Sequence, residues 1–376
     1  MLGQEKEKTN SAKQVEFFRR PSQIPELSGV GAKALDEVAD RFAFRANDYY
    51  LGLIDWDDLD DPIRRLVIPQ RGELDEWGSL DASDEAANTV VHGLQHKYAD
   101  TALFLAASSC AAYCRYCFRK RLFMRPNEEI AQDPGPAISY VRKHVEITDV
   151  LLTGGDPLVL DTGVFARILR GFARIEHVRT VRIGSKTPAF HPGRILDDAA
   201  LIDLLAGVAS KEASLYLMAH FDHPREFTKR AREAIGVIQG AGVHVVNQCP
   251  VVRGVNDDAG VLRDLFEMTT VLGMPQYYLF QVRPTVGNKI YEVPLSRSWQ
   301  LFEAARSSCS GLSRRARLVM SHATGKIEVC GLDRDHIYLR YHRARNPNDE
   351  GRIMVARRDD QAVWFNDLEL IGGDTA

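Results

Sequence analysis

From about residue 100 onward, short apolar or β-branched segments alternate with longer amphipathic segments. This alternation is typical of βα units that build a parallel sheet. Helical patterns such as DTGVFARILRGFARI and DDAALIDLLAGVAS stand between the apolar segments. Six strands are predicted in this way, namely TALFLAAS from Thr101, DVLLTGG from Asp149, TVRIGSK from Thr180, SLYLMAHF from Ser214, VHVVNQCPVV from Val243 and QYYLFQVRP from Gln276.

The two ends of the chain have different patterns. Residues 1–95 read as helices and irregular segments, with an acidic stretch at 55–61 that we interpret as a solvated surface loop. After about residue 310, strand-like alternation in KIEVCGL, HIYLRYH and RIMVARR is separated by polar turns. We therefore expect an α/β fold with a helical N-terminal extension (1–95), a partial (β/α)6 TIM-like barrel (96–309) and a β-rich C-terminal extension (310–376).

Composition and charge narrow the classes of partner. The 376 residues are 45% hydrophobic, which is enough to bury a sizeable core. A formal net charge of −3 provides no basic field for phosphate backbones or acidic lipids, so neither nucleic acid nor a membrane is an expected partner. The polar N-terminus lacks the apolar run of a signal peptide, so the expected location is the cytoplasm.

Three of the six cysteines form the motif CxxxCxxC directly after the first predicted strand, at Cys110, Cys114 and Cys117. In a barrel, this loop lies at the C-terminal ends of the strands, where active sites are built. Three thiolates can bind three irons of a [4Fe-4S] cubane and leave the fourth iron open, whereas an electron-transfer cluster normally uses four cysteines. The alternatives are a zinc site with a distant fourth ligand, or buried thiols. The isolated Cys249, Cys309 and Cys330 are interpreted as small buried hydrophobic residues.

The surroundings of this motif resemble those of the radical S-adenosylmethionine (SAM) superfamily. Tyr116 precedes the third cysteine, a strand precedes the motif, and βα repeats follow it. The segment TGGDPL, with Gly154, Gly155 and Asp156, follows the second strand and is similar to the motif that superfamily members place against the amino group of SAM. Glycines in this position can also serve a tight turn alone. The resemblance implies a [4Fe-4S] cluster and SAM as cofactors.

Within the superfamily, the chain resembles the lysine 2,3-aminomutase family from about residue 48 to at least residue 326. That family cleaves SAM reductively to a 5′-deoxyadenosyl radical and uses pyridoxal phosphate (PLP), held by a lysine, to carry the amino group. The resemblance implies an amino acid substrate, an electron donor such as flavodoxin or ferredoxin, and a homodimer. The stretches that carry it are DPIRRLVIP from Asp61, HKYADTALFL from His96, YCRYCFRKR from Tyr113, VLLTGGDPL from Val150, VRIGSKTP from Val181, HFDHP from His220 and NQCPVVRGVND from Asn247.

The resemblance also implies a PLP site. Lys326 in SHATGKIEV matches the cofactor lysine, although one glycine stands where relatives have several, and a surface lysine in a turn is the alternative. Lys97 and Tyr98 match an arginine and a tyrosine that hold the cofactor phosphate, and a lysine can serve that anion as a point charge. Thr101 stands where the family has a second phosphate-binding arginine, so one charge is missing.

The substrate residues depart from the family pattern. Arg119 matches the arginine that binds the substrate α-carboxylate, and Gln248 belongs to a segment similar to a late SAM-contacting strand. Arg283 stands where lysine-specific members have an aspartate for the distant ammonium group, and Ser321 falls near a second such aspartate. An arginine would repel that ammonium group, so we predict an acidic amino acid such as glutamate as substrate. Alternatively, Arg283 packs outward or binds a cofactor phosphate.

These features predict a radical SAM, PLP-dependent amino acid 2,3-aminomutase. Thr101 and the shortened glycine run leave open a PLP-independent radical SAM enzyme that acts on an amino acid or a protein lysine. A non-catalytic metal or Fe–S binding protein is the alternative from another class. His220 and His223 either line the SAM pocket or are structural, and Lys120 and Arg121 are interpreted as solvated or structural.

Overall fold

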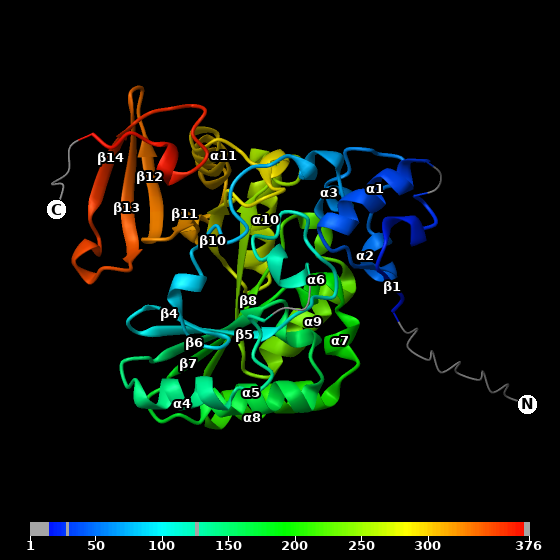
Figure 1. The fold of residues 1–376 in the computed structure, drawn as a ribbon, viewed down its shortest axis with the longest axis vertical. Helices are drawn as coiled ribbons and strands as arrows, with labels where there is room; N and C mark the ends of the chain where they lie inside the picture. The colour runs from blue at the N-terminus through cyan, green and yellow to red at the C-terminus, as the bar shows by residue number, and fades with distance from the viewer. Residues whose placement is uncertain (1–14, 28–29, 125–127, 372–376) are drawn as a thin grey trace, which may run out of the picture.

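The computed structural model describes residues 15–27, 30–124 and 128–371, which form a mixed α/β fold around one large sheet (Figure 1). Seven consecutive strands of this sheet are parallel, and the six strands predicted from the sequence are the first six of them. The parallel strands are β5 (Thr101–Ala107), β6 (Asp149–Gly154), β7 (Thr180–Ser185), β8 (Ser214–Ala219), β9 (His244–Val251), β10 (Gln276–Gln281) and β11 (Arg317–His322).

Helices connect the parallel strands, and side chains at their N-termini explain where several of them begin. Asp161, Asp198, Thr228 and Asp258 each accept a hydrogen bond from a backbone N–H of the first turn that would otherwise lack a partner. In Figure 1, α4, α5 and α8 run side by side along one side of the sheet. The main connecting helices are α4 (Gly135–Lys143), α5 (Thr162–Ala173), α8 (Ala199–Lys211), α9 (Lys229–Gly240), α10 (Ala259–Val271) and α11 (Leu295–Ser307).

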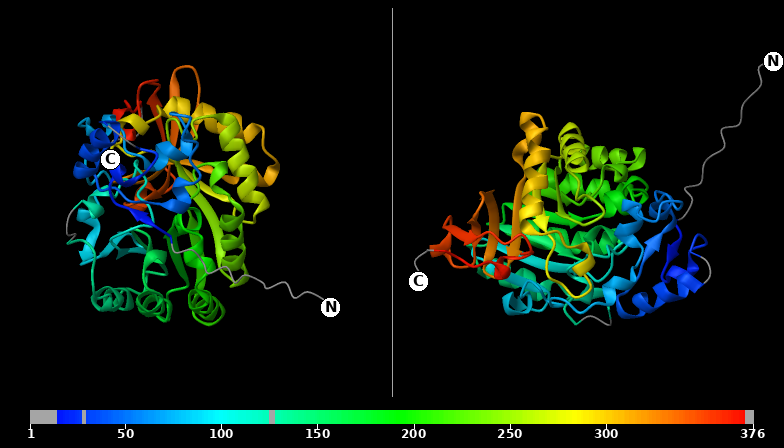
Figure 2. Two further views of the ribbon diagram at one scale, coloured as in Figure 1. Left: turned by 90° about the vertical axis from the view of Figure 1, so that its right-hand side faces the viewer. Right: turned by 90° about the horizontal axis from the view of Figure 1, so that it is seen from above.

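Antiparallel strands extend the sheet at both edges. β3 (Thr89–Val91) and β4 (Leu94–Tyr98) precede β5, and β12 (Gly325–Leu332), β13 (His336–Ala344) and β14 (Ile353–Arg357) follow β11. The three C-terminal strands were predicted, but β3, β4 and β11 were not. The sheet therefore continues across residues 95/96 and 309/310, where the sequence had suggested domain boundaries. Figure 2 shows the N-terminal segments and the C-terminal strands at opposite ends of the molecule.

The N-terminal region consists of short helices and irregular segments, as expected. It contains α1 (Val30–Arg41), α2 (Asp48–Leu51) and α3 (Pro62–Val67), and a small antiparallel pair, β1 (Phe17–Phe18) and β2 (Ala46–Asn47). The acidic stretch 55–61 was expected to be solvated throughout, and this is wrong for its last residue. Asp61 is buried because it accepts a hydrogen bond from the backbone N–H of Arg64 at the start of α3 and pairs with Arg225. A buried carboxylate needs such partners.

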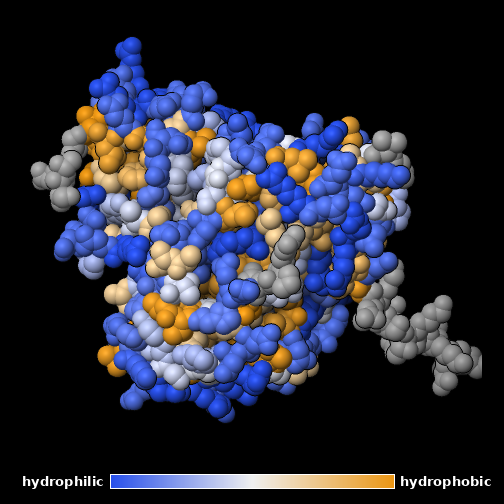
Figure 3. All heavy atoms as spheres, in the orientation of Figure 1, coloured by the Kyte–Doolittle hydropathy of each residue, from blue (hydrophilic) through white to orange (hydrophobic). Residues whose placement is uncertain are grey.

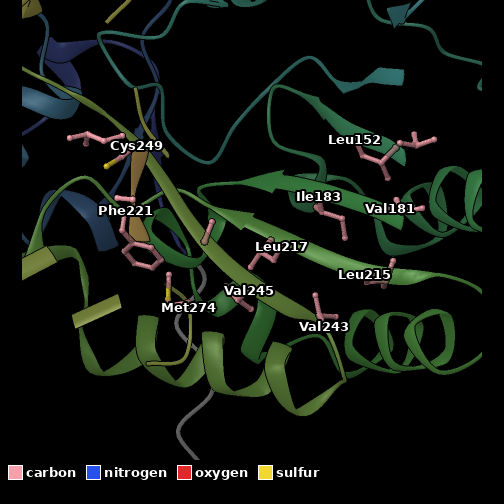
Figure 4. Packing of buried hydrophobic residues seen from close by; sticks show 14 of the residues in the cluster. Leu152, Val181, Ile183, Leu215, Leu217, Phe221, Val243, Val245, Cys249 and Met274 are labelled. Carbon is pink, nitrogen blue, oxygen red and sulfur yellow. The ribbon is translucent and has the colours of Figure 1, made fainter. Parts of the chain in front are cut away.

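Two groups of buried apolar side chains hold these parts together. The larger group lies between the sheet and the helices, where Leu152, Ile183, Leu217 and Val245 point from neighbouring strands toward the helices (Figure 4). The second group joins the N-terminal region to the cysteine loop, because Ile63 and Leu66 pack with Ala111, Ala112 and Tyr116. Burial of this apolar surface favours one position for that loop.

The isolated cysteines and the surface complete the fold. Cys249 and Cys309 are buried as expected, but Cys330 is exposed, so its interpretation as a buried residue is wrong. Cys330 lies on β12 within a stretch of the strand where the register shifts. The face shown in Figure 3 is largely polar. No helix in the described ranges combines the length and apolar character that crossing a membrane would require.

Candidate active site

A cavity of about 330 Å³ opens among the C-terminal ends and the inner faces of the parallel strands. Every residue that the sequence analysis assigned to the site lines this cavity, although these residues come from segments as far apart as β4 and β12. Thr101, His220 and Ser321 line it as well. The cavity has a cysteine end, around the loop that follows β5, and a cationic end, formed by β4, β12, β13 and the segment that follows β10.

Backbone contacts with the N-terminal region hold the cysteine loop. The backbone N–H of Tyr113 donates to the carbonyl of Arg45 over 2.9 Å, and that of Arg115 donates to the carbonyl of Leu66 over 2.9 Å. The guanidinium of Arg115 forms a buried ion pair with Glu73 at 2.7 Å. Because these bonds reach the loop from outside the parallel strands, its shape depends on residues 45–73.

The three cysteine thiols lie in an environment that disfavours their negative charge. Burial raises the pKa of Cys110, and the carboxylate of Asp156 and the other two cysteines raise it further. Burial likewise raises the pKa values of Cys114 and Cys117. A bound cation would reverse this effect, because metal ligation requires the thiolate. The residues therefore fit an iron cluster.

The arrangement of possible metal ligands bears on whether the site suits a single zinc ion. Across residues 15–27, 30–124 and 128–371, no three His, Cys, Asp or Glu side chains converge as one metal ion requires. Cysteines that each bind a different iron of a cubane need not converge on one point. The zinc alternative thus gains no support from the geometry.

The glycine pair after β6 packs against the segment that leads into Cys110. The backbone N–H of Gly155 donates to the carbonyl of Ala107 over 2.6 Å, and that of Asp156 donates to the carbonyl of Ser109 over 2.9 Å. A Cβ on Gly155 would lie 2.3 Å from the Ser109 oxygen. Gly154 has a φ of 106°, which residues with a side chain rarely adopt. Larger residues here would displace the cysteine loop.

The side chain of Asp156 connects the ends of two neighbouring strands. Its carboxylate accepts hydrogen bonds from the hydroxyl of Ser185 and from the backbone N–H groups of Leu158, Lys186 and Thr187, at 2.8 to 3.0 Å. These bonds give Asp156 a structural function at the rim of the cavity, and its contact with SAM stays a prediction. Gln248 lines the same end from β9.

A buried polar network that the sequence analysis missed lies beside the cysteines. Lys186 forms ion pairs with Asp222 at 2.7 Å and with Glu226 at 2.6 Å. The hydroxyl of Tyr116 donates to Asp222 over 2.5 Å and also contacts His220. Burial works against the charge of Lys186, but the two carboxylates outweigh it and raise the pKa of this lysine. The members come from three loops, those after β5, β7 and β8, so sequence spacing does not reveal the network.

Lys326 stands at the cationic end, on β12, and not in a surface turn. Its ammonium nitrogen lies 4.6 Å from the centre of the Tyr278 ring. Burial lowers the pKa of Lys326 to about 7, and the charges of Arg182, Arg343, Arg283 and Lys97 contribute to the shift. Such a lysine is largely neutral above pH 7 and can attack a carbonyl group.

Lys97 and Tyr98 border the same end from β4. Lys97 donates to the backbone carbonyl of His322, and burial, followed by the charges of Arg283 and Arg345, lowers its pKa to about 8. Burial raises the pKa of Tyr98 to about 12. The Tyr98 hydroxyl is buried and has no hydrogen-bond partner among the residues that the structure describes. A buried hydroxyl normally has one, so this donor fits a bound anion.

Two arginines lie close to the ring of Phe118. The guanidinium carbons of Arg283 and Arg119 lie 3.6 Å and 4.7 Å from the centre of its ring. Arg283 is partly buried, lines the cavity and donates to the hydroxyl of Ser83, so the alternative that it packs outward is wrong. Burial lowers the pKa of Arg283 to about 10.

Arg119 has a carboxylate partner that the sequence analysis missed, Glu85. The two side chains form an ion pair at 2.6 Å, and Arg121 pairs with the same carboxylate at 2.6 Å. Burial works to raise the pKa of Glu85, but the two arginines outweigh it and lower the pKa to about 2. Glu85 lies in the region where no site was predicted, before the first predicted strand, so only the tertiary fold shows the contact.

The neighbouring residues have structural contacts. Lys120 and Arg121 were both interpreted as solvated or structural, and their contacts are structural. Arg121 is bound by carboxylates, and Lys120 is buried, 4.6 Å from the centre of the Phe42 ring. His223 accepts a hydrogen bond from the backbone N–H of Arg225. Arg253, in the RGVND segment, donates to the carbonyl of Glu292 outside the cavity.

Comparisons with known proteins agree with this geometry. No family model matches the chain. It is 50% identical over 350 residues, 93% of this chain and 94% of the relative, to a putative L-lysine 2,3-aminomutase of Aquifex aeolicus. It is 34% identical to the L-lysine 2,3-aminomutase of Clostridium subterminale, over 70% of this chain and 62% of that enzyme. It is 33% identical to the glutamate 2,3-aminomutase of Clostridioides difficile, over 78% and 68% of the two chains.

A solved radical SAM methyltransferase from Sphaerobacter thermophilus is similar over 60% of this chain and 68% of that chain, with a TM-score of 0.43 and 14% identity. The sequence relatives carry the assignment, because one of them matches nearly the whole of both chains at half of the positions. The chain belongs to the lysine 2,3-aminomutase family of radical SAM isomerases, whose members use a [4Fe-4S] cluster, SAM and PLP.

Proposed function

We propose that this enzyme is a PLP-dependent 2,3-aminomutase whose substrate is an acidic amino acid, with glutamate as the simplest candidate. When bound, the cluster and SAM supply a radical that abstracts hydrogen, and PLP carries the amino group between adjacent carbons. The observation that supports the proposal most is that Lys326, with its lowered pKa, shares one cavity with the three cysteines and with Arg119 and Arg283.

Lys326 would hold PLP covalently. Its pKa of about 7 provides the neutral amine that must attack the cofactor aldehyde, and no general base has to remove a proton from it above that pH. Burial beside the Tyr278 ring, in a cavity lined by aromatic rings such as Tyr98 and Phe280, excludes water from the bond that forms. The cations around it complement a cofactor that carries a phosphate group, in the way that charged hydrogen bonds do.

Arg119 and Arg283 would bind the two carboxylates of an acidic substrate. Arg119 already has a carboxylate partner in Glu85, which orients its guanidinium, and its Nη1 donates to the hydroxyl of Thr153 over 3.1 Å. Arg283 donates a hydrogen bond to a neutral group, the hydroxyl of Ser83. A substrate carboxylate would compensate the charge of Arg283.

A lysine substrate would place an ammonium group in the same position. Two like charges 4 Å apart repel each other by about 4 kcal/mol at an effective dielectric constant near 20. The glutamate 2,3-aminomutase and the L-lysine 2,3-aminomutases are relatives of similar identity, so identity alone does not choose between their substrates. The partly buried charge of Arg283 favours the acidic substrate.

The test of PLP attachment uses anaerobically reconstituted enzyme supplied with PLP. Borohydride reduction followed by peptide mass spectrometry is expected to give a phosphopyridoxyl adduct at Lys326. The Lys326→Ala variant, loaded with its cluster, should give none. Absence of the adduct from folded wild-type enzyme that cleaves SAM would favour the PLP-independent alternative.

Three further parts of the interpretation belong to this proposal. The six parallel strands from β5 to β10 and their helices support the description as a partial (β/α)6 barrel. Reduction of the cluster needs an electron donor such as flavodoxin or ferredoxin, because reductive cleavage of SAM consumes an electron. Assembly as a homodimer stays a prediction from the family resemblance.

A further inference from the structure

The cationic end contains an arginine that no sequence motif indicated, Arg343 on β13. It reaches the position where the family resemblance leaves a charge missing, because its Nη1 donates to the hydroxyl of Thr101 over 3.2 Å. Its guanidinium carbon lies 4.3 Å from the centre of the Tyr98 ring. Thr101 and Arg343 both line the cavity. The charge that β5 lacks is therefore present in the same place, supplied by another strand.

The pairing of β12 with β13 places Arg343 beside the candidate cofactor lysine. Lys326 and Arg343 are direct partners in the antiparallel register, as are Gly325 and Ala344. A Cβ on Gly325 would lie 2.2 Å from the carbonyl oxygen of Arg343 and 3.0 Å from the Cα of Ala344. The single glycine before Lys326 is thus required for the close approach that brings the two side chains together.

The surrounding groups form a subsite for an anion. The Tyr98 hydroxyl is buried without a partner in the described part of the chain, and Lys97 adds a second cation from the same strand. Arg343 also pairs with Asp100, which lies toward solvent. A guanidinium has five N–H donors, so the bonds to Asp100 and Thr101 leave donors for a ligand.

We propose that Arg343 binds the phosphate group of PLP, together with Tyr98, in place of the arginine that is absent at Thr101. This inference rests on the proposed PLP dependence and adds a residue to it. The ligand class is a phosphate monoester dianion, for which an arginine fork is well suited. The competing interpretation is that Arg343 only stabilises the fold through Asp100.

The experiment measures the dissociation constants of PLP and of pyridoxal, which has the same aldehyde but no phosphate group, for cluster-loaded enzyme. Arg343→Gln should weaken PLP binding about ten- to a hundredfold, the usual cost of a lost hydrogen bond between charged groups. Its affinity for pyridoxal should stay within about twofold of wild type, because the missing bond involves only the phosphate. Readout is the absorbance of the bound cofactor, without turnover.

Matched variants separate binding from folding. Arg340→Gln removes an arginine from the same strand that pairs with Glu328 outside the cavity, and it should leave both constants unchanged. Asp100→Asn removes the ion pair but not the guanidinium, so it should also retain PLP binding. Thr101→Arg in the Arg343→Gln background should restore part of the affinity for PLP by returning the charge to β5.

The outcomes distinguish the inference from the proposed function. If Arg343→Gln binds PLP as tightly as wild type, or loses PLP and pyridoxal equally, the inference is wrong and the PLP-dependent function stands. If Asp100→Asn reproduces the loss of PLP affinity, Arg343 is a structural residue. If the wild-type enzyme binds no PLP at Lys326, the proposed function fails and the inference fails with it.

Discussion

The cysteine end and the cationic end of the cavity are buried to a similar degree but have opposite electrostatics. At the cysteine end, burial and the neighbouring Asp156 raise the pKa of Cys110, which disfavours a thiolate. At the cationic end, burial and neighbouring cations lower the pKa of Lys326 and of Lys97, which disfavours an ammonium group. At each end, charging the buried side chains costs free energy. A cationic ligand at the cysteine end and an anionic ligand at the cationic end would remove this cost.

This electrostatic difference indicates which end of the cavity favours a cationic ligand and which favours an anionic one. A cation is favoured among the thiols and carboxylates, and anions are favoured among Lys97, Lys326, Arg283 and Arg343. Phe118 lies between the ends, next to Cys117 in sequence and against both Arg119 and Arg283 in space. A substrate whose carboxylates contact these arginines would therefore lie between the two cofactors.

The largest expected effect is at the cysteine end. Cys114→Ser should abolish iron binding and SAM cleavage, because three thiolates are the minimum for an open cubane, while PLP attachment at Lys326 should persist. Iron analysis, 5′-deoxyadenosine formation and the borohydride adduct measure the three quantities. Cys330→Ser, at an exposed cysteine, is the matched control and should behave as wild type. Loss of the adduct in Cys114→Ser would show that the two ends are not independent.

The ion-pair cluster beside Phe118 should give the next largest effect. Glu85→Gln leaves Arg119 and Arg121 without their shared buried partner, and breaking such a pair typically costs about 3–5 kcal/mol of unfolding free energy. Because the pKa of Glu85 is lowered to about 2, its contribution is present above pH 4.5 and is lost as the pH falls toward 2. Chemical denaturation of both proteins at pH 7 and pH 3 should show the difference shrinking at the lower pH.

Substrate choice should respond to Arg283 by a smaller amount. Arg283→Gln should raise the KM for glutamate about tenfold or more, as expected for a lost bond between charged groups, with less change in kcat. Arg263→Gln, which removes an exposed arginine paired with Asp264 away from the cavity, is the control. Faster turnover of lysine than of glutamate by the wild-type enzyme would overturn the proposed substrate.

The smallest expected effect is the dependence of PLP attachment on pH. PLP attachment should rise as Lys326 loses its proton near pH 7 and should fall as Lys97 loses its proton near pH 8, because the phosphate then has one cation fewer. Lys97→Arg should keep the charge and extend attachment a few-fold at pH 9. An alkaline limb unchanged by this substitution would mean that Lys97 does not contact the phosphate.

The sequence predicted the parallel strands and the cysteine loop because their signals are local. The six strands from Thr101 onward are apolar enough to be seen by pattern, and the cysteines lie within eight residues. β4, LQHKY, has little apolar character because its polar side chains Gln95, Lys97 and Tyr98 line the cavity, so the pattern did not reveal it.

Contacts between distant segments could not be predicted. Arg343 and Thr101 are 242 residues apart, and their meeting depends on the register of β12 with β13, which shifts after Lys326 and again before Gly331. A shift of one residue would turn Arg343 to the other face of the strand. Glu85 reaches Arg119 through a similarly non-local contact. Position in the sequence alone contains no information on either pair.

β5 connects the two ends, because it begins at Thr101 of the cationic end and finishes at Ala107, three residues before Cys110 of the cysteine end. In the proposed function, the strand would act as a spacer between the two cofactors, at about 3.3 Å per residue. Removal of one residue from β5 would shorten this spacing and would also turn the side chains beyond the deletion to the opposite face. Adaptation to substrates of other lengths must then occur in the segments around Glu85 and Arg283, while the length of β5 stays constant.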